Sequence, residues 1–231
     1  YEMGVVGTIF QDRIPSVAAF QLPFLFTDYD QARAALYEGD YGYQLIGDVA
    51  SLGFTVNGIV PDGFRVMTMN KKVESLADMH GLKMRMPNLE IMVEIGNYLG
   101  FAVTPMSMTE VFSALEQGVI DGQENPPSTI RSQGWYEIQD YLLVSNHVFT
   151  SLFLCVNNDF YNSLDSELQN ILDEVIDETC AQIWDTAQTQ AQEDLDYMSS
   201  EGGIEVYEPS DSFRQEMVEA TAPMYDNMYE T

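Results

Sequence analysis

The segment 166–200 constrains the fold more than any other part of the chain, because it contains neither glycine nor proline, the residues that most often interrupt a helix. Apolar or small side chains recur along it at helical spacing, at Leu168, Ile171, Leu172, Val175, Ile176, Thr179, Ile183, Trp184 and Ala187. Gly202 and Gly203 follow it. The pattern predicts one unusually long helix over 166–200. A coiled coil is disfavoured, because the apolar spacing drifts after Ala187 and 188–196 is nearly all polar.

The rest of the chain alternates short strand patterns with short helix patterns, which predicts an α/β fold. The expected strands are 2–6, 17–20, 54–60, 64–69, 82–86, 102–106, 141–144, 151–157 and 204–206. The expected helices, besides the long one, are 28–36, 41–52, 89–99, 110–117 and 213–228. Ser107 or Thr109 is expected to cap the helix 110–117, and 61–63 is expected to form a turn between two strands.

Cations are scarce in this chain, yet several of them occur close together. Nine Lys and Arg stand against 37 Asp and Glu, which gives a formal charge of −28. Five of the nine lie in a short segment, at Arg65, Lys71, Lys72, Lys83 and Arg85. In the expected strand 82–86, Lys83 and Arg85 share one face. A guanidinium matches a carboxylate with two parallel hydrogen bonds, so an arginine on a short strand beside a cleft is suited to bind an organic acid.

Composition and motifs exclude several other classes of function. The scarcity of Lys and Arg argues against nucleic acid as a partner. No stretch reaches the roughly 18 uninterrupted apolar residues that a membrane span needs. The two histidines, His80 and His147, belong to no metal-ligand motif, and no P-loop or nucleophile-elbow motif occurs. We therefore expect no catalysis, no metal and no cofactor. We interpret Cys155 and Cys180 as buried thiols rather than a disulfide.

Four motifs, in order along the chain, resemble those of one protein family. Residues 22–26 read LPFLF, 63–65 read GFR, 75–88 read SLADMHGLKMRMPN, and 109–126 read TEVFSALEQGVIDGQENP. The third resembles the family pattern s-x-x-D-x-x-G-x-K-x-R-x-P, and the fourth resembles E-V-y-x-A-L-q-x-G-v-v-D-G-q-E-N-P. These are motifs of the solute-binding proteins of TRAP transporters, the tripartite ATP-independent periplasmic systems. The resemblance covers essentially the whole chain.

The resemblance implies a two-lobed fold like that of periplasmic binding proteins, with mixed sheets flanked by helices and the long helix spanning both lobes. Lobe I would comprise 1–62 and 151–190, lobe II 63–150 and 191–231, and the ligand cleft would lie between them. Relatives carry a further βαβα segment of lobe I before the point where this sequence starts. The chain would cross between the lobes near 61–63 and near 146–147, and the lobes would close on the ligand.

The resemblance also implies a set of ligand-binding residues. Arg85 would be the main carboxylate clamp, with Arg65 as a second donor and Asn125 as a hydrogen-bonding partner. Asn88 and His147 would complete the wall. Met108 stands where the family usually has phenylalanine, so the contact at that position is less certain.

A protein of this family would be a monomeric periplasmic or extracytoplasmic receptor that hands an organic acid to a TRAP membrane permease. Asn88, Asn125 and His147 suit a ligand with hydroxyl groups, which favours a sugar acid such as a uronate. A C4-dicarboxylate is the alternative ligand. A ligand-sensing protein without a transport role, or a structural protein, is the alternative from another class.

Overall fold

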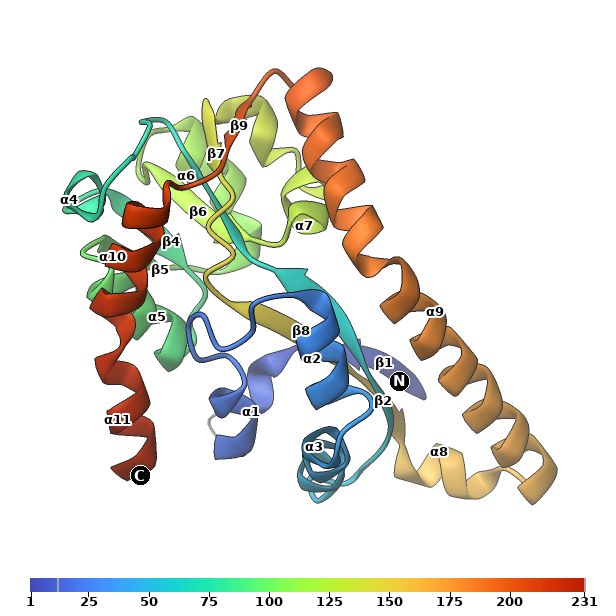
Figure 1. The fold of residues 1–231 in the computed structure, drawn as a ribbon. Coiled ribbons are helices and arrows are strands. Elements are labelled where there is room, and N and C mark those ends of the chain that lie inside the picture. Colours follow the sequence, from blue (N-terminus) through green and yellow to red (C-terminus); the bar gives the residue numbers. More distant parts are fainter. Residues whose placement is uncertain (12, 231) are drawn as a thin grey trace. The chain divides into compact units, whose positions relative to one another are not determined.

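The computed structural model describes residues 1–11 and 13–230, which form two compact units (Figure 1). Unit 1 comprises Tyr1–Gln21, Leu25–Gly63 and Phe149–Thr189. Unit 2 comprises Leu22–Phe24, Phe64–Val148 and Gln190–Thr231. Among the described residues, no helix is both long enough and apolar enough to cross a membrane.

Unit 1 contains a three-stranded sheet in the order β1 (Met3–Val6), β8 (Phe149–Asn157) and β2 (Phe54–Phe64). The predicted turn at 61–63 was wrong, because β2 continues through these residues. Strand β2 lies at the edge of this sheet. Pro61 has no N–H to donate, and an edge strand tolerates it because no further strand pairs with its outer side. The Thr150 hydroxyl of β8 donates to the Gly63 carbonyl at 3.3 Å and helps to hold this end of the strand.

Short helices make up the remainder of unit 1: η1 (Thr8–Phe10), α1 (Pro15–Ala19), α2 (Tyr29–Leu36), α3 (Asp40–Ala50) and α8 (Asn158–Ser163). The strand predicted at 17–20 was wrong, because α1 occupies most of it. Val17 and Phe20 are fully buried, and a short apolar run of this kind does not distinguish a strand from a helix. Pro15 favours the helix, since its fixed φ suits the first helical turn.

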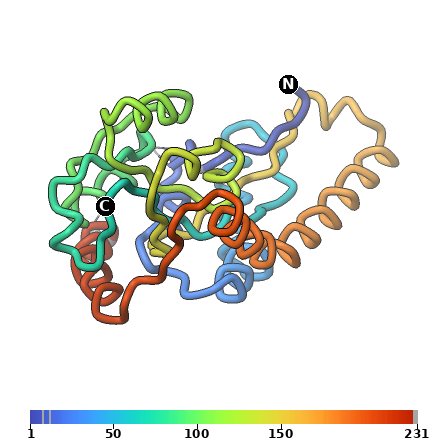
Figure 2. Tube along the Cα trace, turned by 90° about the horizontal axis from the view of Figure 1, so that it is seen from above, coloured from blue at the N-terminus to red at the C-terminus, as the bar shows by residue number. Residues whose placement is uncertain are grey.

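Helix α9 (Ser166–Ser200) has the predicted bounds, and Figure 2 traces it as one uninterrupted coil. In unit 1, Ile176 and Cys180 of α9 pack with Val60 of β2 and Val156 of β8. The Trp184 indole donates to the Ile59 carbonyl at 2.9 Å, which fixes the helix against β2. The prediction for the cysteines is confirmed, because Cys155 and Cys180 are buried and unbonded to each other.

Unit 2 contains a mixed six-stranded sheet in the order β5-β4-β6-β3-β7-β9. Its strands are β3 (Val66–Met69), β4 (Lys83–Met86), β5 (Ala102–Pro105), β6 (Gly122–Asn125), β7 (Tyr141–Leu143) and β9 (Glu205–Tyr207). Strand β4 is parallel to β5 and β6, β3 is antiparallel to β6 and β7, and β9 is parallel to β7. The predicted α/β fold with mixed sheets flanked by helices is therefore confirmed (Figure 1).

The helices of unit 2 are α4 (Leu76–Met79), α5 (Glu90–Tyr98), η2 (Met108–Glu110), α6 (Val111–Glu116), α7 (Pro127–Ser132), η3 (Trp135–Ile138), α10 (Asp211–Thr221) and α11 (Pro223–Glu230). Of the two predicted caps, Ser107 and Thr109, the structure uses Ser107. It forms a capping box with Glu110 at the start of η2. The prediction of a single helix over 213–228 was wrong. Helix α10 ends before Ala222, and Pro223 starts a separate helix, α11. Proline lacks the N–H that a continuous helix would need there.

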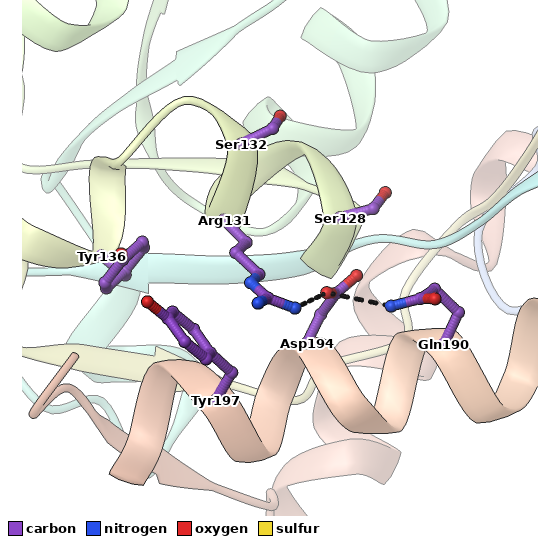
Figure 3. Close-up of a pocket in the computed structure, with 7 residues that line it drawn as sticks. All are labelled: Ser128, Arg131, Ser132, Tyr136, Gln190, Asp194 and Tyr197. Atoms are coloured by element: carbon purple, nitrogen blue, oxygen red, sulfur yellow. Dashed lines mark hydrogen bonds and ion pairs between the residues drawn. The ribbon is translucent and has the colours of Figure 1, made fainter. Parts of the chain in front are cut away.

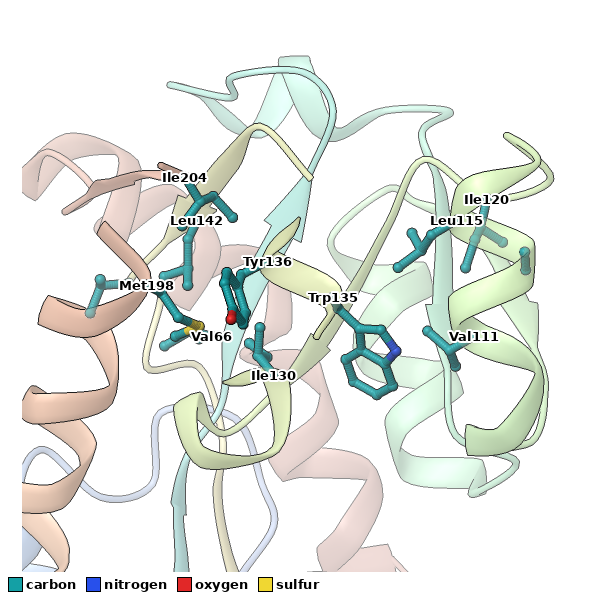
Figure 4. Close-up of a cluster of buried hydrophobic side chains, with 12 residues drawn as sticks. Val66, Val111, Leu115, Ile120, Ile130, Trp135, Tyr136, Leu142, Met198 and Ile204 are labelled. Carbon is teal, nitrogen blue, oxygen red and sulfur yellow. The ribbon is translucent and has the colours of Figure 1, made fainter. Parts of the chain in front are cut away.

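A buried apolar cluster lies between the sheet of unit 2 and the helices beside it (Figure 4). Trp135 and Tyr136 of η3 pack there with Ile130 of α7 and Met198 of α9. The cluster also contains Val66, Val111, Ala114, Leu115, Ile120, Leu142, Val144 and Ile204. Burial of these side chains holds α6, α7 and the end of α9 against the strands that carry the polar residues described next.

Candidate functional site

One edge of the unit 2 sheet gathers the polar residues of the site. Strands β4, β5 and β6 are parallel, so their carboxyl ends meet at this edge, and the antiparallel β3 starts there directly after Arg65. The strand register aligns Arg85 with Gln123, and Gln123 with Thr68. Paired residues on neighbouring strands point to the same face of a sheet. Ligands commonly bind at the carboxyl ends of such strands.

Arg85 is a buried cation with little compensation from the protein. The residue is only 4% exposed. Its guanidinium donates to the Met106 carbonyl from Nε at 3.1 Å and from Nη2 at 2.9 Å. Among the described residues it forms no ion pair with a carboxylate. Burial lowers the pKa of Arg85 to about 10, although the charge of Glu124 opposes this effect.

Arg65 lies nearby, but its guanidinium is engaged with Glu124. Nε donates to Glu124 Oε2 at 2.5 Å, and Nη2 donates to Oε1 at 2.9 Å and to the Glu124 carbonyl at 2.8 Å. Burial would raise the pKa of Glu124, but the charge of Arg65, the hydrogen bonds from Arg65 and the nearby His147 ring lower it to about 2. Glu124 is thus an ionised carboxylate that neutralises Arg65.

His147 completes this buried group from the segment that follows β7. Its Nε2 lies 3.3 Å from Glu124 Oε2, and its Nδ1 lies 2.8 Å from the Ser145 hydroxyl. The backbone around it is strained, because Asn146 has a φ of 46°. Phe24, with a φ of 58°, donates its N–H to the His147 carbonyl at 2.8 Å. Two non-glycine residues in left-handed conformations beside one buried polar cluster are typical of functional sites.

Asn125 belongs to a second buried chain of hydrogen bonds. Its Nδ2 donates to Gln123 Oε1 at 2.8 Å, and Gln123 Nε2 donates to the Thr68 hydroxyl at 3.0 Å. Gln123 and Thr68 are fully buried. Gln123, Thr68 and Glu124 were not among the predicted ligand-binding residues. The alternation of Gln123 and Asn125 along one strand was the signal that could have found the first of these.

Contacts in the structure join some of the predicted site residues and not others. Arg65 and His147 both contact Glu124, and Arg85 and Asn125 lie on neighbouring strands. Asn88 is exposed in the bend between β4 and α5, and Met108 is 41% exposed at the start of η2. Neither side chain forms a hydrogen bond with the buried cluster within the described part of the chain. His80 is exposed.

The charges of the site decide what it can hold. Arg65 and Arg85 are two guanidinium groups, and Glu124 is the carboxylate beside them. Arg65 is paired with Glu124, whereas the buried charge of Arg85 has no carboxylate partner among the described residues. No group of His, Cys, Asp and Glu suited to a metal ion occurs in the described ranges 1–11 and 13–230. The arrangement suits a bound anion.

An α/β fold of two compact units, one of which carries a buried cation at the carboxyl edge of its sheet, is an arrangement suited to a solute-binding protein. The family model DctP, described as bacterial extracellular solute-binding protein, family 7, matches residues 1–231. The chain belongs to this family. The predicted resemblance to TRAP solute-binding proteins is confirmed.

Curated relatives match most of this chain but extend beyond it. The C4-dicarboxylate-binding periplasmic protein DctP of Rhodobacter capsulatus is 30% identical over 91% of this chain and 63% of its own length. The sialic acid-binding periplasmic protein SiaP of Vibrio cholerae is 30% identical over 92% of this chain and 65% of its own length. An uncharacterized protein of Haemophilus influenzae is 32% identical over 99% of this chain and 69% of its own length.

Solved structures give the same assignment. A TRAP periplasmic solute-binding protein from Haemophilus influenzae with bound L-gulonate has a TM-score of 0.89 and 32% identity, and the match covers 99% of this chain and 75% of that one. The sugar acid-binding protein DctPAm from Advenella mimigardefordensis in complex with galactonate has a TM-score of 0.91 and 28% identity, with 98% and 73% covered.

Proposed function

We propose that this protein is an extracytoplasmic receptor for a small organic acid, which it binds through Arg85 and delivers to a TRAP membrane permease. The observation that carries the proposal is the buried Arg85 guanidinium, which has no carboxylate partner among the described residues. A buried cation without a partner is unfavourable, and burial lowers the pKa of Arg85 accordingly. A ligand carboxylate would supply the missing charge through two charge-assisted hydrogen bonds.

Arg65 would support this binding less strongly than Arg85. Glu124 occupies much of its guanidinium, so the pair has little net charge of its own. We propose that Arg65 contributes a second, weaker donor to the ligand, and that His147 orients Glu124 rather than contacting the ligand first. Asn125 would bind the ligand with the part of its carboxamide that Gln123 leaves available.

The same charges favour a ligand with one carboxylate. A dicarboxylate would need a second buried cation without a partner, and Arg65 is paired with Glu124. Hydroxyl groups need no such cation, and exposed Asn88 and buried Asn125 can bond to them. Two similar proteins were solved with L-gulonate and with galactonate. A sugar acid, such as a uronate or an aldonate, is therefore the proposed ligand class, and a C4-dicarboxylate is the alternative.

A thermal-shift screen of the purified protein tests this proposal. L-gulonate, D-galactonate, D-glucuronate, succinate and L-malate are each added at the same concentration, with sodium chloride at matched ionic strength as the control. We expect the sugar acids to raise the melting temperature and the two dicarboxylates to raise it less, because ligand binding stabilises the native state by mass action. A larger shift with succinate or L-malate would replace the sugar acid with a dicarboxylate. No shift with any acid would contradict the receptor assignment.

A further inference from the structure

Unit 2 contains a second polar site, formed by α7, η3 and the last part of α9 (Figure 3). It is a pocket of about 440 Å³, which is within the range of roughly 300–1,000 Å³ typical of small-molecule sites. Its lining residues are Ser128, Arg131, Ser132, Tyr136, Gln190, Asp194 and Tyr197. None of them belongs to the buried cluster around Arg85 and Glu124.

Arg131 lies at the centre of this pocket, where a carboxylate and an aromatic ring hold its guanidinium. Its Nη1 donates to Asp194 Oδ1 at 2.7 Å, and its guanidinium carbon lies 3.8 Å from the centre of the Tyr197 ring. Gln190 Nε2 donates to the same Asp194 oxygen at 3.3 Å. Figure 3 shows these side chains converging from α7 and α9. A guanidinium fixed by a ring and a carboxylate is pre-organised and loses little entropy when a ligand binds.

The charge balance of the pocket differs from that at Arg85. Arg131 has its own carboxylate, since the Asp194 side chain is only 5% exposed and paired with it. The pair has no net charge. An anion would meet the negative Asp194 beside Arg131, and a cation would compete with Arg131 for that carboxylate. A neutral ligand avoids both penalties.

The polar atoms that remain available are both donors and acceptors. Within the described residues, Nε and Nη2 of Arg131 donate to no protein acceptor, and Gln190 Oε1 accepts no hydrogen bond. The exposed Ser128 and Ser132 add hydroxyl groups. A ligand hydroxyl can donate and accept, so it matches such a mixed set better than a group with one role. The Tyr197 ring, which is 37% exposed and meets the buried Tyr136 ring edge to face at 6.2 Å, offers an apolar edge for C–H groups.

We propose that this pocket binds a neutral polyhydroxylated molecule, a monosaccharide or a cyclic polyol, independently of the organic acid site. Because the pocket is open to solvent and offers few contacts, a hexose with about twelve non-hydrogen atoms should bind with a Kd on the order of 1–10 mM.

Saturation-transfer NMR with D-glucose, D-galactose and myo-inositol as probes tests the proposal. We expect saturable binding of at least one probe to the wild-type protein and to Arg85→Met, which removes the proposed carboxylate clamp. Ser132→Trp should abolish the signal, because the exposed Ser132 lies on the pocket wall and a large ring there fills it. Ser128→Trp fills the same pocket from the preceding turn of α7 and serves if Ser132→Trp does not fold. Ser199→Trp, at an exposed position of α9 outside the pocket, should retain binding.

Three results would overturn the proposal. The first is a failure of every probe to saturate the wild-type protein up to about 50 mM, which is at least about five times the expected Kd. The second is a binding signal that persists in both pocket-filling variants, Ser132→Trp and Ser128→Trp. The third is displacement of the probe by sodium sulfate at constant ionic strength, which would assign the pocket to anions. A loss of organic acid binding in Arg85→Met leaves all of these readouts unaffected, so failure of the receptor proposal and failure of this one are distinguishable.

Discussion

Replacing Glu124 with glutamine should destabilise the protein in a manner that depends on pH. Glu124 is a fully buried carboxylate that accepts hydrogen bonds from Arg65, and its pKa is lowered from 4.5 to about 2. Glutamine keeps the shape but removes the negative charge that the Arg65 guanidinium contacts in the buried cluster. Removing one partner of a buried ion pair typically costs about 3–5 kcal/mol, and we expect Glu124→Gln to lose this much at pH 6.

The pH dependence follows from the direction of the pKa shift. A carboxylate whose pKa is lower in the folded state stabilises the protein fully above its unfolded pKa, near 4.5, and loses that contribution as the pH falls toward 2. The whole shift corresponds to about 3 kcal/mol, and about 2 kcal/mol of it is lost by pH 3. The difference between wild type and Glu124→Gln should therefore narrow by about 2 kcal/mol between pH 6 and pH 3.

Urea unfolding at several pH values, followed by tryptophan fluorescence, measures this difference. Trp135 is a suitable reporter, because it is buried in the apolar cluster of unit 2, the unit that contains Glu124. Glu116→Gln is the control, since Glu116 is exposed on α6 of the same unit. Its effect should stay within about 0.5 kcal/mol at every pH. A Glu124→Gln effect below about 1 kcal/mol, or one that does not change with pH, would refute the reasoning.

Other predictions concern binding, packing and shape. Asn125→Ala should weaken organic acid binding by about 2- to 13-fold, as expected for one neutral hydrogen bond, and calorimetry that finds an unchanged Kd would reduce Asn125 to a structural role. Gly58→Val should lower the free energy of unfolding by about 1–3 kcal/mol, because an added Cβ would meet the Cys180 sulfur. Unchanged urea unfolding would refute this. We also expect small-angle scattering to show a smaller radius of gyration with ligand than without, whereas an equal radius at saturation would rule out closure.

Local patterns predicted the elements whose periodicity is long or whose caps are strong. Helix α9 repeats its apolar positions from Leu168 to Ala187 and contains no glycine or proline, and Ser107 with Glu110 forms a recognisable cap. Predictions from shorter sequence patterns were wrong where the surrounding fold determines the secondary structure. The run that became α1 suits a strand equally well, and Pro61 reads as a turn unless the chain around it is known to lie at a sheet edge.

The candidate site shows the same limit. The motif around Arg85 pointed to a carboxylate-binding arginine, and the structure places that side chain in a buried position. Arg65 pairs with Glu124, which lies 59 positions away in the sequence, so no local sequence pattern predicts this pair. The sequence also did not predict which side chains are buried. Burial distinguishes Arg85 from Lys83, which is exposed on the same strand. Charges that act together in a site have to be read from the fold.

Calorimetry of Arg85→Met and Lys83→Met tests the central claim most directly. Both variants remove one cation from β4, but only Arg85 is buried at the carboxyl end of the strand. With L-gulonate, or whichever acid the screen selects, Arg85→Met should weaken binding by about 30- to 5,000-fold, the usual effect of truncating a desolvated charge pair. Lys83→Met should change the Kd by less than about twofold. Near-wild-type affinity for Arg85→Met in a folded protein would contradict the assignment of Arg85 as the carboxylate clamp.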